Sequence, residues 1–356
     1  MSIHKKPYLV IPHLIEQPTW GGDYILETKN WTHKTNWQGK KIGQSYELYS
    51  GTKLAQDIRL SADRSFGPEY KKTIDISHFG EDRPFPLIKF TQAKGNSFQL
   101  HTKPGTTDPR WLPKAESWYY FESGKITLGI KKGADMTRYK QVCKEIELHM
   151  KDVSAQIRAG RITLEDAKHQ AHAFITAKDP WQFVNVYNVA PETLIDLSGG
   201  GLHHSWEEDE DNPLGNVVYE VQQDVMDPVS TIRSFDQGKI MEDGTIREIH
   251  IDDYFTYLDQ SEERNTYIPT QGGEGELLFT NPHYSLARLA VNVDRPMHAD
   301  TSFHHLFVKE GEVKVIAGKD EIVITRGHSG FIPKGVTYVI HPDHPSIVLH
   351  TFLGNS

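Results

Sequence analysis

Short runs of apolar and β-branched residues, separated by Gly, Pro, Asn and Asp, recur over most of the 356-residue chain. Runs of this length bounded by turn residues are typical of strands. The expected strands include residues 85–91, 97–102, 117–121, 125–130, 183–189, 193–197 and 216–223. This pattern predicts an all-β barrel or sandwich, and at about 150 residues per domain the length suggests two domains.

One region breaks the β pattern. From 135 to about 177 there is hardly a Gly or Pro, and apolar residues recur at helical spacing, namely Tyr139, Val142, Cys143, Ile146, Met150, Val153 and Ile157. We expect two helices here. Gly160 would end the first, and Thr163 with Asp166 would cap the second. The helical insertion, about 135–178, would then lie between two strands of one barrel.

A second set of strands is expected from about 277 to 352, with turns at Gly311, Gly318, Gly327, Lys334-Gly335 and Pro342 spaced roughly every 8 to 12 residues. That spacing predicts a second, smaller barrel. We therefore divide the chain into a first domain, 1–240, a connecting segment of helix and loop, 241–275, and a second domain, 276–356.

Composition excludes several classes of protein. The lone Cys143 cannot form an internal disulfide or a thiolate metal cluster, which favours a reducing compartment. Thirty-nine basic and 48 acidic residues give a net charge of −9, and no basic block indicates a nucleic-acid partner. No run approaches the roughly 18 apolar residues of a membrane span, and no signal-peptide pattern stands at the start. We expect a cytoplasmic protein that binds neither membrane nor nucleic acid.

Four residues could together hold a metal ion. Gln99 and His101 alternate along one predicted strand and so share a face, while Glu116 and His203 lie further along the chain. Such nitrogen and oxygen donors suit Zn²⁺ and leave positions for water or substrate. Taken singly, each has a plainer explanation, because a strand histidine is usually hydrogen-bonded and a carboxylate usually solvated. The combination is what indicates a site.

The segments around these residues carry recognisable motifs. They are Trp20-Gly21-Gly22, then residues 43–50, 85–90, 96–101 and 114–119, and downstream 219–223, 231–236 and 247–251. In order and spacing they resemble the motifs of the bacterial type I phosphomannose isomerases, zinc enzymes of the cupin superfamily that interconvert mannose 6-phosphate and fructose 6-phosphate. The resemblance implies two cupin barrels of the jelly-roll type, with the helical insertion in the first.

Carried over position by position, the resemblance implies one Zn²⁺ per chain held by Gln99, His101, Glu116 and His203. Placing residues 191–204 on the family's corresponding segment without a gap puts His203 on the ligand position and His204 on that of a small residue. Adjacent strand residues face opposite sides, so only one of the two would point at the metal.

The resemblance also places a sugar phosphate in the pocket, as a small-molecule partner. It implies substrate-binding roles for Ser97, Lys89, Lys114 and Arg233, and catalytic roles for Arg233, Lys114 and Glu220. Aldose–ketose isomerisation by way of an enediolate needs a proton carrier near neutral pH. The sequence does not rank Glu220 against Lys114 for that role.

Several residues depart from the family pattern. Thr102, Gln44, Tyr46 and Ser198 replace family residues, and the stretch 224–228 replaces a Ser-Asp pair close to Arg233. An isomerase of another sugar phosphate, an Fe-dependent oxygenase using His101, Glu116 and His203, and a non-enzymatic sugar-phosphate binder therefore stay as alternatives.

In the second domain, residues 327–335 resemble the second cupin motif. Tyr338 stands where that motif places its metal histidine, so we expect no metal there, although His304 and His305 lie in the partner segment. The sequence leaves the oligomeric state open.

Overall fold

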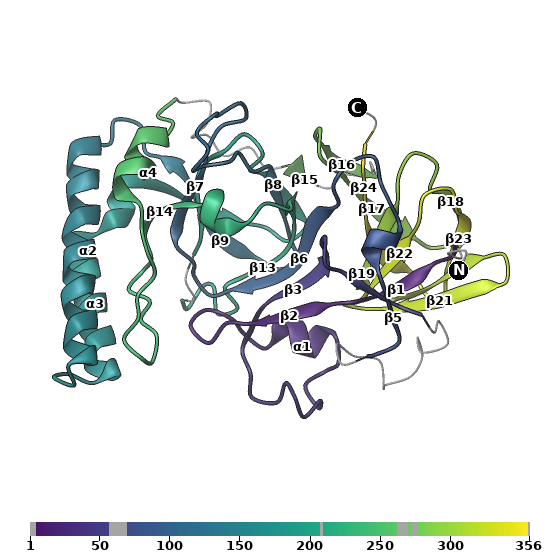
Figure 1. Cartoon of the computed structure of the whole chain (residues 1–356), viewed down its shortest axis with the longest axis horizontal. Helices are drawn as coiled ribbons and strands as arrows, with labels where there is room; N and C mark the ends of the chain where they lie inside the picture. The colour runs from purple at the N-terminus through teal and green to yellow at the C-terminus, as the bar shows by residue number, and fades with distance from the viewer. Residues whose placement is uncertain (1–4, 57–69, 207–208, 262–269, 272–275, 355–356) are drawn as a thin grey trace.

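β-Strands dominate the fold, which is mainly β with few helices, as the sequence pattern predicts. The computed structural model describes residues 5–56, 70–206, 209–261, 270–271 and 276–354. Every strand pairing within these residues is antiparallel, and the strands form four sheets. Two β-barrels lie next to each other, with helices α2, α3 and α4 beyond the first barrel (Figure 1).

The first barrel consists of two sheets that enclose a common interior. In the larger sheet the strand order is β15 (Thr270–Gln271), β11 (Thr193–Asp196), β8 (Glu116–Tyr120), β13 (Asn216–Gln223), β6 (Pro86–Ala93), β3 (Ile42–Leu48) and β2 (His13–Glu16). In the smaller sheet it is β10 (Val184–Val189), β9 (Gly124–Ile130), β12 (Gly201–Ser205), β7 (Phe98–His101) and β14 (Ile232–Phe235). The strands predicted in this region are confirmed to within about two residues at each end.

The second barrel pairs an eight-stranded sheet with a four-stranded one. The order in the larger is β16 (Leu277–Thr280), β17 (Ser285–Val291), β24 (Ser346–Phe352), β19 (His304–Glu310), β22 (Ser329–Ile332), β1 (Tyr8–Ile11), β4 (Lys53–Ala55) and β5 (Thr73–Asp75). The order in the smaller is β18 (Arg295–His298), β23 (Thr337–Pro342), β20 (Glu312–Ala317) and β21 (Asp320–Thr325). Three strands from the start of the chain thus join the sheet of the C-terminal region, and the division of domains at residue 240 stays a prediction.

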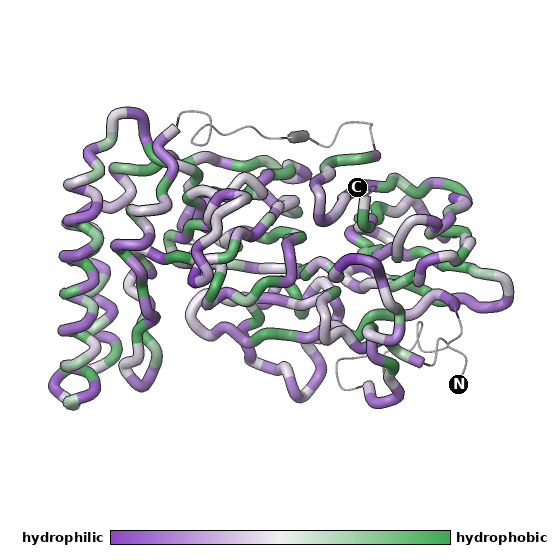
Figure 2. Tube along the Cα trace, turned by 45° about the horizontal axis from the view of Figure 1, so that its top comes forward, coloured by the Kyte–Doolittle hydropathy of each residue, from purple (hydrophilic) through white to green (hydrophobic). Residues whose placement is uncertain are grey.

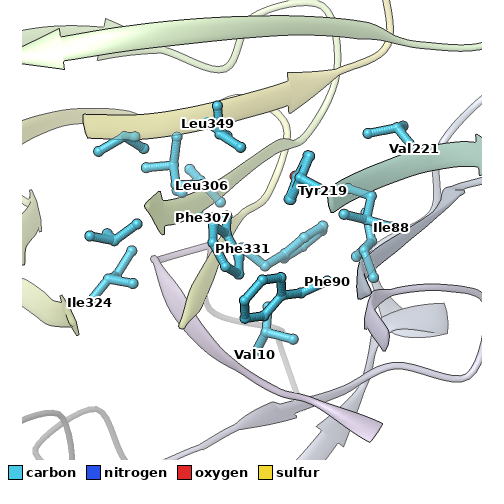
Figure 3. Close-up of a cluster of buried hydrophobic side chains, with 14 of the residues drawn as sticks. Val10, Ile88, Phe90, Tyr219, Val221, Leu306, Phe307, Ile324, Phe331 and Leu349 are labelled. Carbon is cyan, nitrogen blue, oxygen red and sulfur yellow. The ribbon is translucent and has the colours of Figure 1, made fainter. Parts of the chain in front are cut away.

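Side chains on the outer face of β6 and β13 pack the first barrel against the second. Ile88 and Phe90 on β6, with Tyr219 and Val221 on β13, point out of the first barrel and pack against the second, where they meet Leu306, Phe307, Phe331 and Leu349 (Figure 3). The Tyr219 hydroxyl also lies 3.1 Å from Nδ1 of His305. Because successive strand residues face opposite sides, the residues between them point into the first barrel.

The helical insertion is confirmed in its place and its boundaries. Helices α2 (Met136–Arg158) and α3 (Leu164–Lys178) lie between β9 and β10, which pair with each other. Thr163 caps α3 in a capping box with Asp166, as predicted. The apolar stripe of α2 packs on β14 and on α4 (Ile251–Tyr257), so the insertion covers the outer side of the smaller sheet. Helix α4 lies in the predicted connecting segment, of which residues 262–269 and 272–275 fall outside the described part.

Apolar residues are dispersed in short runs along the chain. Hydrophilic and hydrophobic positions are mixed along α2 and α3 in Figure 2. Among the described helices, none combines the length and the apolar character that a membrane span requires.

A buried ion pair links residues of the first barrel to residues of the second. Nζ of Lys29 lies 2.7 Å from Oε1 of Glu47, and both side chains have 0% exposure. Ser45 and Ser329 donate to the same carboxylate at 2.6 and 2.7 Å, and Lys29 also donates to the carbonyl of Gly327. Residues from both parts of the chain therefore satisfy one desolvated carboxylate.

Removing one partner of this pair should destabilise the protein strongly. We expect Lys29→Met to lower the free energy of unfolding by about 3–5 kcal/mol, because it leaves Glu47 buried without its counterion. Urea denaturation would measure the loss. The matched control is Lys41→Met, which breaks a half-exposed pair with Asp23 and should cost less than about 1 kcal/mol. Equal losses in the two variants would contradict the assignment.

Candidate metal centre and substrate cavity

Strand register in the smaller sheet of the first barrel sets three polar residues in a row. Gln99 on β7 is directly opposite His203 on β12 and Arg233 on β14. Residues directly opposite each other in a sheet face the same side, so all three point into the barrel. His101, two residues beyond Gln99, shares that face.

The larger sheet presents a second polar row across the interior. Glu220 on β13 is opposite both Lys89 on β6 and Trp118 on β8, and Lys89 is in turn opposite Tyr46 on β3. Glu116 lies two residues before Trp118, on the same face. The two sheets therefore present their polar residues to one shared space, while a small apolar cluster that includes Trp118, Ile126 and Val218 fills the rest of the interior.

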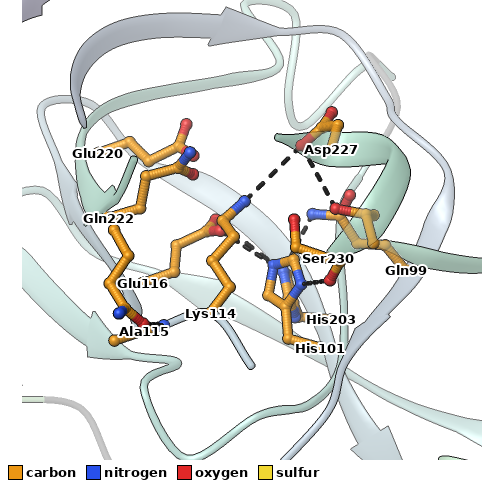
Figure 4. A network of polar contacts seen from close by, with 12 residues as sticks. Gln99, His101, Lys114, Ala115, Glu116, His203, Glu220, Gln222, Asp227 and Ser230 are labelled. Atoms are coloured by element: carbon orange, nitrogen blue, oxygen red, sulfur yellow. Dashed lines mark hydrogen bonds and ion pairs between the residues drawn. The ribbon is translucent and has the colours of Figure 1, made fainter. Parts of the chain in front are cut away.

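Three of the four predicted ligands form a compact cluster. The nearest ligand atoms of His101, Glu116 and His203 all lie within 4.8 Å of one another, and each residue is 1% exposed. Nε2 of His101 is 3.0 Å from Oε2 of Glu116, and Nε2 of His203 is 4.0 Å from Oε1 (Figure 4). Within the described residues, no other group of this kind is found.

Hydrogen bonds on the outer nitrogens fix both imidazoles. Nδ1 of His101 donates to the carbonyl of Ser230 at 2.7 Å, and Nδ1 of His203 donates to that of Gly201 at 3.2 Å. Because a carbonyl only accepts, each Nδ1 carries a hydrogen, and in the neutral form of the ring Nε2 turns its lone pair inward. A backbone acceptor on the far nitrogen is the usual support of a metal-binding histidine.

This arrangement fits a cation. Since Nδ1 of His101 is bonded to Ser230, the unprotonated Nε2 and the carboxylate of Glu116 are two acceptors only 3.0 Å apart. Two acceptors at this distance repel each other unless a cation or an additional proton lies between them. Burial, with the neighbouring His101, lowers the pKa of His203 to about 3, so its imidazole is neutral and able to ligate.

Glu116 is held as an anion. Burial opposes its ionisation, but the charge of Lys114, with Nζ 2.8 Å from Oε2, and contacts with His101 hold the pKa of Glu116 well below its usual range. The indole of Trp118 donates to the other oxygen at 2.5 Å. A buried carboxylate in its charged form is the donor that a divalent cation prefers.

Gln99, the fourth predicted ligand, lies beside the cluster. Its amide nitrogen donates to Nε2 of His203 at 3.0 Å. Since the two ends of the amide exchange places on rotation about the terminal bond, the carbonyl oxygen can turn to the same point. His204, by contrast, faces the other side of β12. The centroid of its ring lies 4.4 Å from that of Phe98 and 5.9 Å from that of Trp206.

A glycine lets the ligand-bearing strands approach each other. Gly200 has φ +77°, and a Cβ there would lie 2.7 Å from the carbonyl oxygen of His101. A side chain at this position would be strained and would push β12 away from β7. The glycine at position 200 thus has a role in placing His203.

Glu116 of this cluster and the neighbouring Gln99 line a cavity of about 200 Å³. The residues predicted to bind substrate, Ser97, Lys89, Lys114 and Arg233, line it together with Glu220, which was predicted to be catalytic. Lys89 pairs with Glu220 at 2.9 Å, and Nε of Arg233 donates to Oγ of Ser97 at 3.2 Å. Burial, with the charge of Glu116, raises the pKa of Glu220, although Lys89 lowers it.

Some residues around the site are not predicted as site residues. Trp118 could have been, because it lies two residues from Glu116 on one strand. Asp227 falls in the altered stretch 224–228, but its contact with Lys114, like that of Ser230 with His101, depends on the course of the loop that leads from β13 to β14. A larger groove of about 880 Å³ lies between α2 and residues 235–249, and it contains none of the predicted site residues.

The fold and the cluster define a class of protein. The chain has the mainly β cupin fold with a buried His/Glu/His group that could bind a metal. No protein-family model matches the sequence, and no curated protein matches it.

Solved structures place this fold among those of mannose 6-phosphate isomerases. The enzyme of Bacillus subtilis is 18% identical, with a TM-score of 0.65 over 97% of this chain and 99% of that one. A zinc-bound mannose 6-phosphate isomerase is 13% identical, with a TM-score of 0.62 over 98% and 100%. A phosphomannose isomerase variant from Salmonella typhimurium is likewise 13% identical, with 0.62 over 98% and 99%.

Proposed function

We propose that this protein is a zinc-dependent aldose–ketose isomerase that interconverts mannose 6-phosphate and fructose 6-phosphate. The observation that carries the proposal is the convergence of His101, Glu116 and His203 beside a cavity that Glu116 and several basic side chains line. The full-length likeness to mannose 6-phosphate isomerases supports the same activity.

In this proposal one Zn²⁺ per chain is held by Gln99, His101, Glu116 and His203. When bound, the ion would act as a Lewis acid toward the carbonyl and hydroxyl oxygens of the sugar. The backbone carbonyls of Ser230 and Gly201 keep both imidazoles oriented toward the ion.

The remaining polar residues would bind the sugar and move its proton. Isomerisation transfers a proton between C2 and C1 by way of an enediolate, so it needs a group that can take up and return that proton. Glu220 is suited to this because burial raises its pKa toward neutrality, and Lys114 is the second candidate. Arg233 and Ser97 would bind the phosphate or a hydroxyl at the cavity wall, and Lys89 holds Glu220 in place.

A coupled assay for conversion of mannose 6-phosphate to fructose 6-phosphate tests the proposal. We expect turnover that is lost on chelation and restored by zinc, with one zinc per chain by elemental analysis. Turnover that depends on iron and consumes oxygen would point instead to an oxygenase, and stoichiometric zinc without turnover to a binding protein.

The proton carrier can be assigned with two variants. We expect Glu220→Gln to lower kcat by at least about a hundredfold, because the amide cannot take up the proton. Lys114→Met should lose turnover too, but with a rise in KM, since it also removes a charge beside the cluster. Retained kcat in either variant would exclude that residue as the essential base.

A further inference from the structure

Asp227 sets a carboxylate where an anionic substrate group would bind. It opens a short 3-10 turn, Asp227–Val229, in the loop between β13 and β14, and its side chain is 60% exposed at the cavity. Its Oδ2 lies 3.4 Å from Nη2 of Arg233, and Oδ1 lies 3.8 Å from Nζ of Lys114.

The backbone beneath Asp227 is held firmly. The amides of Ser230 and Thr231 donate to the Asp227 carbonyl at 3.2 and 3.0 Å, and the amide of Leu112 donates to Val229 at 2.6 Å. Ser230 in turn accepts from Nδ1 of His101. A movement of this loop would break the hydrogen bond that orients His101, so the backbone of Asp227 is held beside Arg233.

Each basic side chain in the described lining already has an acidic partner. Lys89 pairs with Glu220, Lys114 with Glu116, Arg233 with Asp227, and Arg247 with Asp236 at 3.3 Å. A phosphate dianion needs positive charge that is not already neutralised. To reach Arg233 it must displace Asp227 or remain beside it, and like charges a few ångströms apart repel strongly in a partly buried site.

A neutral sugar hydroxyl meets no such obstacle. It can donate to the carboxylate of Asp227 and accept from Arg233 at once, because a hydroxyl is both donor and acceptor. We propose that Asp227 is a specificity-determining residue, which weakens the binding of a substrate phosphate and allows the unphosphorylated aldose to compete as a substrate. The effect of Asp227 on phosphate binding does not depend on the proposed function. The prediction that the aldose is a substrate rests on the proposed isomerase activity.

Asp227→Asn tests the inference, since the amide removes the charge, keeps the shape and can still contact Thr231. By calorimetry at fixed ionic strength, we expect inorganic phosphate to bind at least about tenfold more tightly to the variant than to the unaltered protein. The ratio of kcat/KM for mannose 6-phosphate to that for mannose should rise by a similar factor. Combining it with Arg233→Ala should abolish the gain in phosphate affinity.

The matched control is Asp224→Asn in the same loop. Asp224 accepts from the amide of Ser50 at 2.9 Å and does not line the cavity, so phosphate affinity should be unchanged. Unchanged or weaker phosphate binding in Asp227→Asn would overturn the inference, as would an equal gain in both variants. If zinc-loaded protein turns over neither sugar, the proposed function fails, while the phosphate measurement still decides the role of Asp227.

Discussion

We expect the His101→Ala variant to bind no zinc and to turn over substrate at least about a thousandfold more slowly than the unaltered protein. The imidazole is 1% exposed, its Nε2 is 3.0 Å from Glu116, and its Nδ1 is bonded to Ser230. An alanine removes a ligand and leaves the carbonyl of Ser230 unpaired, so the site loses both the donor and its orientation. A Lewis acid contributes several kcal/mol to stabilising developing charge, which corresponds to about three orders of magnitude in rate.

Elemental analysis and the coupled assay together check this expectation. His204→Asn provides the sharp control, because His204 is the next residue after a proposed ligand but faces Phe98 on the other side of the strand. That variant should retain its zinc. Stoichiometric zinc in His101→Ala, or loss of zinc in His204→Asn with His203 intact, would refute the proposed ligand set.

Acid should unfold the protein well before its carboxylates titrate. Burial lowers the pKa of His304 to about 4 and those of His305 and His328 to about 3, all of them in the second barrel. These imidazoles stay neutral in the folded chain but take up protons near pH 6.5 when unfolded. Stability is therefore present above pH 6.5 and is lost as the pH falls from there toward 4 or 3.

The expected loss of unfolding free energy follows from the linkage between proton binding and folding. Each of these histidines should lower the free energy of unfolding by about 1 kcal/mol between pH 6.5 and 5.5, so the three together remove about 3 kcal/mol over that interval. Urea denaturation at several pH values measures the slope. His305→Gln should reduce this slope by the contribution of about one proton. His33→Gln, at an exposed position, should leave the slope unchanged. A flat profile between pH 7 and 5 would contradict the prediction.

Local sequence pattern was enough for the elements themselves. The capping box of Thr163 and Asp166, the apolar stripe of α2 and the strands β6 to β11 and β13 follow from short-range rules, because turns, caps and periodicity depend on neighbouring residues. The shared face of Gln99 and His101 follows equally, from the two-residue period of a strand. The resemblance to a known family added the expectation that Glu116 and His203 join them.

Other features depend on contacts between distant parts of the chain. The sequence does not indicate that β1 pairs with β22, more than 300 residues away, because the choice of a partner strand depends on packing over the whole sheet. It shows the altered stretch before Arg233 but not where Asp227 points, since a loop takes its course from what it packs against.

The sequence by itself determined the mainly β architecture, the helical insertion and the residue types able to hold a metal, since each is encoded over a few adjacent positions. Only the tertiary structure decided that His101, Glu116 and His203 meet within 4.8 Å, and that each basic side chain in the described lining of the cavity already has an acidic partner. The physical reason is register: pairing of β12 with β7, and closure of two sheets around one interior, bring together side chains that lie about 100 residues apart.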